Sequence, residues 1–155
     1  MISRWHAEGA EAALARAGLG TFDAIWDLDV GHVEEPNVRR GGWSGVSRIA
    51  LPYADGPCSV FLKRQADHVT RTVRHPISGE PTLHREFTRL CQFARLAIPA
   101  PTALHYAHAK EAGEWRAMLL VGEVPGRPLT SWLDEYATAS RAARAAVMDA
   151  VADLC

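Results

Sequence analysis

The spacing of hydrophobic and polar residues changes several times along the chain, and each change predicts a different element. Residues Trp5–Ala17 have helical spacing and strong helix formers, and Gly18 and Gly20 close the stretch, so we expect a helix there. The apolar stretch Thr21–Leu28 fits either a short strand or another helical turn. Glu34–Pro36 then interrupts regular structure.

Four later stretches are expected to be strands: Val46–Pro52, Cys58–Gln65, Thr102–His108 and Trp115–Gly122. The first two are separated by Tyr53–Pro57, which contains an Asp-Gly pair, a strong hairpin signal. The charged turn Ala109–Glu114 joins the last two. Because each pair is joined by a short turn, we expect an antiparallel sheet.

From Thr82 onward the apolar residues recur with a period of 3.6 and predict an amphipathic helix whose buried stripe is Leu83, Phe87, Leu90, Cys91 and Ala94. Pro99 and Pro101 prevent its continuation. After the linker Pro125–Pro128, helices are expected over Leu129–Tyr136 and Arg141–Leu154. The fold class is therefore α+β, an antiparallel lobe followed by the first helices of a second part.

Composition narrows the class of protein. The chain has 155 residues, enough for one domain, and 17 basic against 18 acidic side chains, so no global basicity suggests nucleic acid. No apolar run approaches the roughly 18 residues of a membrane span, and the N-terminus lacks a signal-peptide core. Three cysteines without a C-x-x-C pair predict neither disulfides nor a zinc site. We expect a cytoplasmic protein.

Charge is nevertheless distributed unevenly. Residues 1–35 carry a net charge of −5, residues 36–90 carry +5 and residues 91–155 carry −1. A basic middle segment that also contains three histidines fits binding of phosphate or another anion, or else a set of scattered solvated charges. The histidines, whose spacings match no compact metal site, are His68, His75 and His84.

Three features carry candidate chemistry. Gly41, Gly42 and Gly45 fall within five residues, and such a segment either lets backbone N–H groups approach phosphate or is only a turn. Lys63 ends an apolar strand, on the face of Phe61, where a lysine either reaches water at a sheet edge or sits over a phosphate.

The third feature is Glu86, which borders the buried stripe of the amphipathic helix and therefore needs a partner. Lys63 is the natural one, although Arg85 or Arg89 would serve in a purely structural pairing. A glycine-rich hairpin, a strand lysine and a helix glutamate, in this order, form the layout of a protein-kinase-like N-lobe. Met118–Gly126 resembles the hinge that meets adenine in that layout.

Four stretches resemble the lipopolysaccharide kinase (Kdo/WaaP) family, in its InaA-like branch: Asn37–Arg48, Phe61–Gln65, Arg74–Pro76 and Gly79–Phe87. The resemblance implies phosphoryl transfer from ATP, with Mg²⁺, to a sugar hydroxyl of the lipopolysaccharide core, at the cytoplasmic side of the inner membrane. It also implies which residues bind the nucleotide. Gly41, Gly42, Ser44 and Gly45 would cover the triphosphate, Glu86 would hold Lys63 at the phosphates, and Glu123 and Val124 would offer hinge backbone groups. Phe61, where many kinases have a small residue, would either stack on adenine or crowd it.

The resemblance divides the chain into an N-terminal helical extension (residues 1–35), a kinase-like lobe (36–124) and a hinge with the start of an incomplete helical C-lobe (125–155). No His-x-Asp or Asp-Phe-Gly sequence follows the hinge. The general base and the Mg²⁺ ligands are therefore expected beyond Cys155, and this chain alone is expected to be inactive.

Other functions remain open at this point. One is a non-catalytic module that binds a nucleotide or anion, in which a second copy or another protein covers the apolar faces of residues 129–154. Another is a fragment of an aminoglycoside- or choline-kinase-like phosphotransferase, and a third is an unrelated fold in which the glycines only make a turn. The basic run Arg64–Arg74 fits either contact with an anionic glycolipid or a solvated loop.

Overall fold

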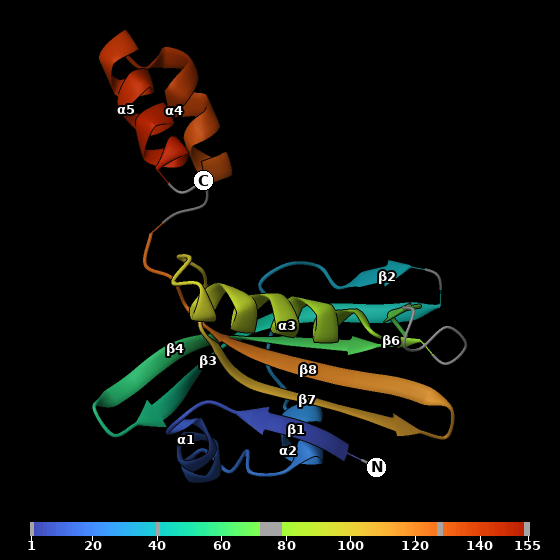
Figure 1. Ribbon diagram of the computed structural model, residues 1–155. Helices are drawn as coiled ribbons and strands as arrows, with labels where there is room; N and C mark the ends of the chain where they lie inside the picture. Colours follow the sequence, from blue (N-terminus) through green and yellow to red (C-terminus); the bar gives the residue numbers. More distant parts are fainter. Residues whose placement is uncertain (1, 40, 72–78, 127–128, 154–155) are drawn as a thin grey trace.

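The computed structural model describes residues 2–39, 41–71, 79–126 and 129–153. Within them, a six-stranded antiparallel sheet has the strand order β1-β7-β8-β4-β3-β2 (Figure 1). Its strands are β1 (Ile2–His6), β2 (Asn37–Arg39), β3 (Gly42–Tyr53), β4 (Gly56–Ala66), β7 (Ala103–Glu111) and β8 (Glu114–Gly122). A separate small ribbon pairs β5 (Val69–Thr70) with β6 (Glu80–Pro81).

Helices cover both faces of this sheet. Helix α3 (Thr82–Arg95) lies on one face, and α1 (Ala10–Arg16) with α2 (Phe22–Trp26) lies on the other (Figure 1). Successive side chains of a strand point to opposite faces, so β4 and β8 contribute to two cores. Under α1 and α2 the core includes Leu14, Phe22, Ile25, Val60, Leu62 and Leu120, and under α3 it includes Leu83, Phe87, Tyr106, Leu119 and Val121.

The hairpin of β3 and β4 confirms the predicted strand pair. Its turn lies at Ala54 and Asp55, and Gly56 follows with a φ of 121°, a conformation that side chains disfavour. On its other side β4 pairs with β8, which places Lys63 opposite Val46 of β3 and opposite a leucine of β8. Lys63 therefore lies in an interior strand, and the edge interpretation of this lysine is wrong.

The N-terminal residues differ from the expectation. The helix expected from Trp5 begins only at Ala10, because Ile2–His6 form strand β1 along β7. The Trp5 ring packs against Phe87 of α3 with a centroid separation of 5.0 Å, which adds to this edge pairing. Residues Phe22–Trp26, where strand and helix were both open, form a helix capped by the Thr21 hydroxyl.

The last elements are a 3₁₀ turn (η1, Leu129–Trp132), α4 (Leu133–Thr138) and α5 (Arg141–Ala152), close to the predicted helices. Figure 1 draws α4 and α5 as a pair beyond the sheet. Apolar side chains of this pair are exposed, including Leu133 and Met148. Among the described helices, none is long and apolar enough to cross a membrane.

Candidate functional site

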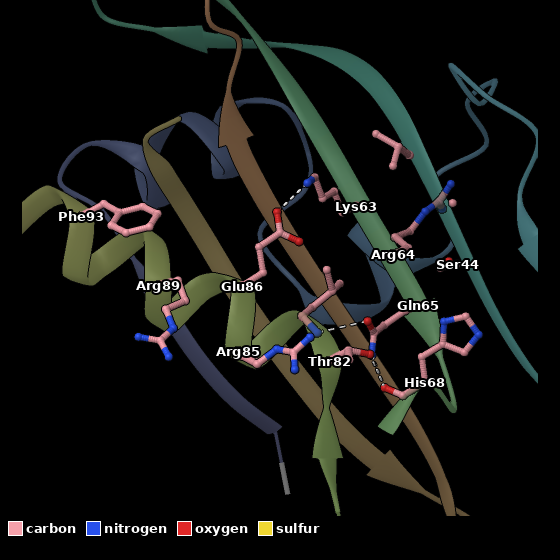
Figure 2. Close-up of a pocket in the computed structure, with 13 residues that line it drawn as sticks. Ser44, Lys63, Arg64, Gln65, His68, Thr82, Arg85, Glu86, Arg89 and Phe93 are labelled. Atoms are coloured by element: carbon pink, nitrogen blue, oxygen red, sulfur yellow. Dashed lines mark hydrogen bonds and ion pairs between the residues drawn. The ribbon is translucent and has the colours of Figure 1, made fainter. Parts of the chain in front are cut away.

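An open cavity of about 880 Å³ lies between α3 and the strands β3 and β4 (Figure 2). Its border is formed by residues of the glycine segment, by the last residues of β4 and by one side of α3. The lining residues are Ser44, Gly45, Val46, Lys63, Arg64, Gln65, His68, Thr82, Leu83, Arg85, Glu86, Arg89 and Phe93. Three features singled out from the sequence thus meet at one cavity: the glycine segment, the strand lysine and the helix glutamate.

Lys63 and Glu86 form an ion pair at this cavity. The Nζ atom of Lys63 lies 2.5 Å from Oε1 of Glu86, so the predicted partner is present and neither Arg85 nor Arg89 takes its place. The side chains are 30% and 39% exposed, respectively. The pair is therefore formed and still open to a ligand that enters the cavity.

Close packing explains two of the glycines. A Cβ atom added at Gly42 would lie 2.1 Å from Cδ2 of His68, and one at Gly45 would lie 2.7 Å from Cε1 of His32. Gly41 is a turn residue with a φ of 77°. Of the four predicted glycine-segment residues, Ser44 and Gly45 line the cavity, whereas Gly41 and Gly42 do not. The space beside Gly42 and Gly45 holds histidine rings, which the sequence did not indicate.

Glu123 and Val124, the predicted hinge residues, do not line this cavity. The Glu123 carboxylate accepts a hydrogen bond of 2.7 Å from Nη2 of Arg48. Two hydrogen bonds lower the pKa of this carboxyl group, the larger effect coming from Ser59 and the smaller from Arg48. The Glu123 amide donates to the Ser59 carbonyl at 3.1 Å, so this N–H is already used within the sheet.

Arg64 does not belong to a basic surface. Its side chain leaves the opposite face of β4 and donates to the carbonyl oxygens of Trp26 and Leu28, at 2.6 Å and 2.9 Å. Arg64 is buried, and its guanidinium is already bonded to these two carbonyl groups. The other end of that basic run, Arg74, lies outside the described residues. Phe61 is half-buried and packs against the core under α3.

The charge around the cavity is mainly positive. Arg85 and Arg89 are exposed residues of α3, one turn apart, and both line the cavity (Figure 2). Among the described lining residues, Glu86 is the acidic one, and Lys63 already pairs with it. Such a lining favours an anionic ligand.

Gln65 is a site residue that the sequence reasoning missed. It is 4% exposed, and its side chain bonds to both His68 and Leu83 (Figure 2). The available signal was its place in the strand, because alternation puts Gln65 on the same face as Lys63. Its partners could not be identified from spacing alone.

Comparison with known proteins gives the family. The sequence profile of the lipopolysaccharide kinase (Kdo/WaaP) family matches residues 23–155, most of the chain. This chain belongs to that family. Protein InaA of Escherichia coli (strain K12) is 32% identical over 134 residues, which cover 84% of this chain and 60% of InaA. The chain thus spans less than two thirds of the length of this relative. No solved structure matches.

Kinases, for which this family is named, use ATP together with Mg²⁺. The positive cavity with its lysine–glutamate pair fits a nucleotide phosphate. For Mg²⁺ the residues do not fit: in the described part of the chain, no three His, Cys, Asp or Glu side chains converge. Of the three histidines noted above, His84 pairs with Glu80 at 2.7 Å, and His75 lies outside the described residues.

Proposed function

We propose that this chain supplies the nucleotide-binding part of an ATP-dependent phosphotransferase that acts on a sugar hydroxyl of the lipopolysaccharide core. Family membership supports phosphotransferase chemistry at the level of the family. The observation that carries the proposal is the Lys63–Glu86 ion pair beside the glycine segment. An ammonium group held at an open cavity is suited to bind the oxygens of a nucleotide phosphate.

The geometry of the pair explains how it would bind phosphate. A lysine ammonium has three N–H donors, and one of them is directed to Glu86. Two donors remain for the α- and β-phosphates. Glu86 orients the ammonium, and Arg85 and Arg89 keep the surrounding field positive. The proposed role of Glu86 is therefore to position Lys63, not to touch the nucleotide.

The order of the strands supports a kinase-like N-lobe. In the sheet, the hairpin of β2 and β3 lies beside the lysine strand β4, which is followed by β8 and β7. Helix α3, which carries Glu86, precedes β7 in the chain and covers the same face as Lys63. In such a lobe the glycine segment covers the triphosphate. The position of Ser44 and Gly45 at the cavity of Lys63 supports that role for these two residues, and we propose the same role for their neighbours Gly41 and Gly42.

For adenine, the proposed contacts come from the backbone after β8. The Glu123 amide already bonds to Ser59, so we assign adenine binding to the Glu123 carbonyl and to the Val124 backbone. Gly122 precedes them, and a Cβ atom there would meet Thr102 no closer than 3.9 Å. The described residues thus bind and orient the nucleotide, and we assign neither the general base nor the Mg²⁺ ligands to them.

Titration of the 155-residue chain with ATP, followed by calorimetry, tests the proposal. Lys63→Ala is expected to weaken binding at least tenfold, about 1.4 kcal/mol, because the phosphates lose charge-assisted hydrogen bonds. The sequence has one other lysine, Lys110, whose Nζ lies 5.3 Å from the ring centroid of Trp115, and it does not line the cavity. Lys110→Ala should bind ATP as the unmodified chain does. Equal affinity of the Lys63→Ala and unmodified chains, or no binding by the latter, contradicts the proposal.

A further inference from the structure

The loop that leaves β4 is held in an unusual conformation. Asp67 has a positive φ of 51°, which is uncommon for a residue other than glycine. Two hydrogen bonds to Trp115 hold it there: the Asp67 amide donates to the Trp115 carbonyl at 2.9 Å, and the Trp115 amide donates to Oδ1 of Asp67 at 2.8 Å. This turn brings the next carbonyl group, that of His68, to the first residue of α3.

Three donors converge on the His68 carbonyl oxygen. The Thr82 amide donates at 2.9 Å and the Thr82 hydroxyl at 2.8 Å, both from the start of α3. The third donor is Nε2 of Gln65, at 2.6 Å, from β4. One oxygen atom therefore joins the strand, the loop and the helix. The His68 ring also fills the space beside Gly42, so β3 is tied to the same junction.

Gln65 completes this junction with the other end of its amide group. Its Oε1 accepts a hydrogen bond of 3.1 Å from the Leu83 amide, one of the N–H groups that the first turn of a helix leaves without a partner (Figure 2). Because Nε2 faces the His68 carbonyl and Oε1 faces the Leu83 N–H, the amide group can adopt only this orientation. Because Gln65 is buried, loss of its side chain would leave the Leu83 amide without this acceptor and would remove one of the three donors to the His68 carbonyl.

The junction and the ion pair connect the same strand to the same helix. Gln65 follows Lys63 by two residues on one face of β4, a rise of about 7 Å. Leu83 precedes Glu86 by three residues on α3, a rise of about 4.5 Å. A shift or rotation of α3 against β4 would therefore disturb both links. We propose that Gln65 is a positioning residue that fixes α3 against β4 so that Glu86 meets Lys63. Its consequence for ATP binding rests on the proposed function.

A double-mutant cycle of Gln65→Leu and Glu86→Gln tests this proposal through the affinity for ATP. Gln65→Leu is expected to weaken ATP binding three- to tenfold in the chain that has Glu86, and less than twofold in the Glu86→Gln chain. The matched control is Gln92→Leu, the same change at the sequence's other glutamine, which lies exposed on α3 and bonds to Arg89. It should leave affinity unchanged. Equal losses in both backgrounds overturn the proposal.

Urea unfolding without nucleotide separates this inference from the proposed function. It is measured for the unmodified chain, for the two single variants of the cycle and for the double variant. The shift in midpoint caused by Gln65→Leu should be smaller when Glu86→Gln is present, and additive shifts overturn the proposal even if the unmodified chain fails to bind ATP. If Gln65→Leu does not fold, Gln65→Glu replaces it in the cycle. That variant keeps an acceptor for the Leu83 amide, whereas its carboxylate cannot donate to the His68 carbonyl and adds a negative charge.

Discussion

Lys63 Nζ and Glu86 Oε1 lie 2.5 Å apart, although 23 residues separate them and one stands on a strand while the other stands on a helix. Both side chains are about one-third exposed. Exposed ion pairs contribute at most about 1 kcal/mol to folding stability. The value of this pair therefore lies in where it places the lysine charge, beside the cavity.

Removal of the glutamate charge should separate binding from stability. Glu86→Gln is expected to lower ATP affinity three- to tenfold, because Lys63 is no longer oriented, and to change the free energy of unfolding by less than about 1 kcal/mol. Calorimetric titration and urea unfolding measure the two quantities. Glu111→Gln, at an exposed glutamate on β7, is the matched control and should alter neither. Unchanged affinity together with a large loss of stability would argue for a purely structural pair.

The elements that carry the pair were predictable because their local patterns are strong. Alternation over residues 58–65 places Phe61 and Lys63 on one face of a strand, and β4 has this arrangement. The period of 3.6 after Thr82 places Glu86 at the border of a buried stripe, and α3 has this arrangement too. A carboxylate that borders a buried stripe needs a counter-charge, which identified Lys63 as the partner.

Strand β1 was not predictable from its own residues. Ile2–His6 is mostly exposed, and the residues from Trp5 onward have helical spacing, so the sequence predicted a helix there instead of a strand. What makes it a strand is pairing with β7, where Trp5 lies opposite Tyr106 about one hundred residues later. Such long-range hydrogen bonds override local propensity and leave no signal in the nearby sequence.

The packing around the glycine segment was equally hidden. The glycines at 42 and 45 suggested close approach to phosphate, whereas the structure places the rings of His68 and His32 beside them. The junction at Gln65 depends on the turn at Asp67, and a positive φ at an aspartate cannot be inferred from spacing. These contacts follow from tertiary structure only.

The glycine contacts predict sharp differences among alanine substitutions. Gly42→Ala and Gly45→Ala are each expected to lower the free energy of unfolding by about 1 to 3 kcal/mol, because the added methyl group overlaps a histidine ring. At Gly31 a Cβ atom would meet nothing within 4 Å, so Gly31→Ala should be neutral or slightly stabilising. Urea unfolding of the three variants is the measurement. Equal stabilities would refute the described packing.

A buried histidine predicts how stability depends on pH. Burial first, and the nearby His6 second, lower the pKa of His105 to about 4, although its hydrogen bond to the Trp5 carbonyl opposes this shift. Since the unfolded chain takes up this proton near pH 6.5, the stabilising contribution is complete above that pH and is lost as the pH falls toward 4. The loss attributable to His105 is about 3 kcal/mol.

His105→Asn tests this pH dependence. Asparagine does not titrate and retains an N–H donor for the Trp5 carbonyl. Urea unfolding between pH 7 and pH 4 should show a smaller decline in stability for the variant than for the unmodified chain. Parallel declines in the two proteins would contradict the assignment of a neutral, buried His105.

The most direct test of nucleotide binding at Lys63 is affinity labelling with an acyl-phosphate derivative of ATP. A lysine amine beside the bound phosphates attacks the acyl carbonyl, an amide bond forms, and the nucleotide phosphate leaves. Peptide mass spectrometry then compares the chain's two lysines, Lys63 and Lys110, within one sample. We expect labelling of Lys63 that excess ATP suppresses, and only weak labelling of Lys110 that ATP does not change. Equal labelling of both lysines, or labelling of Lys63 that ATP does not suppress, would contradict the account.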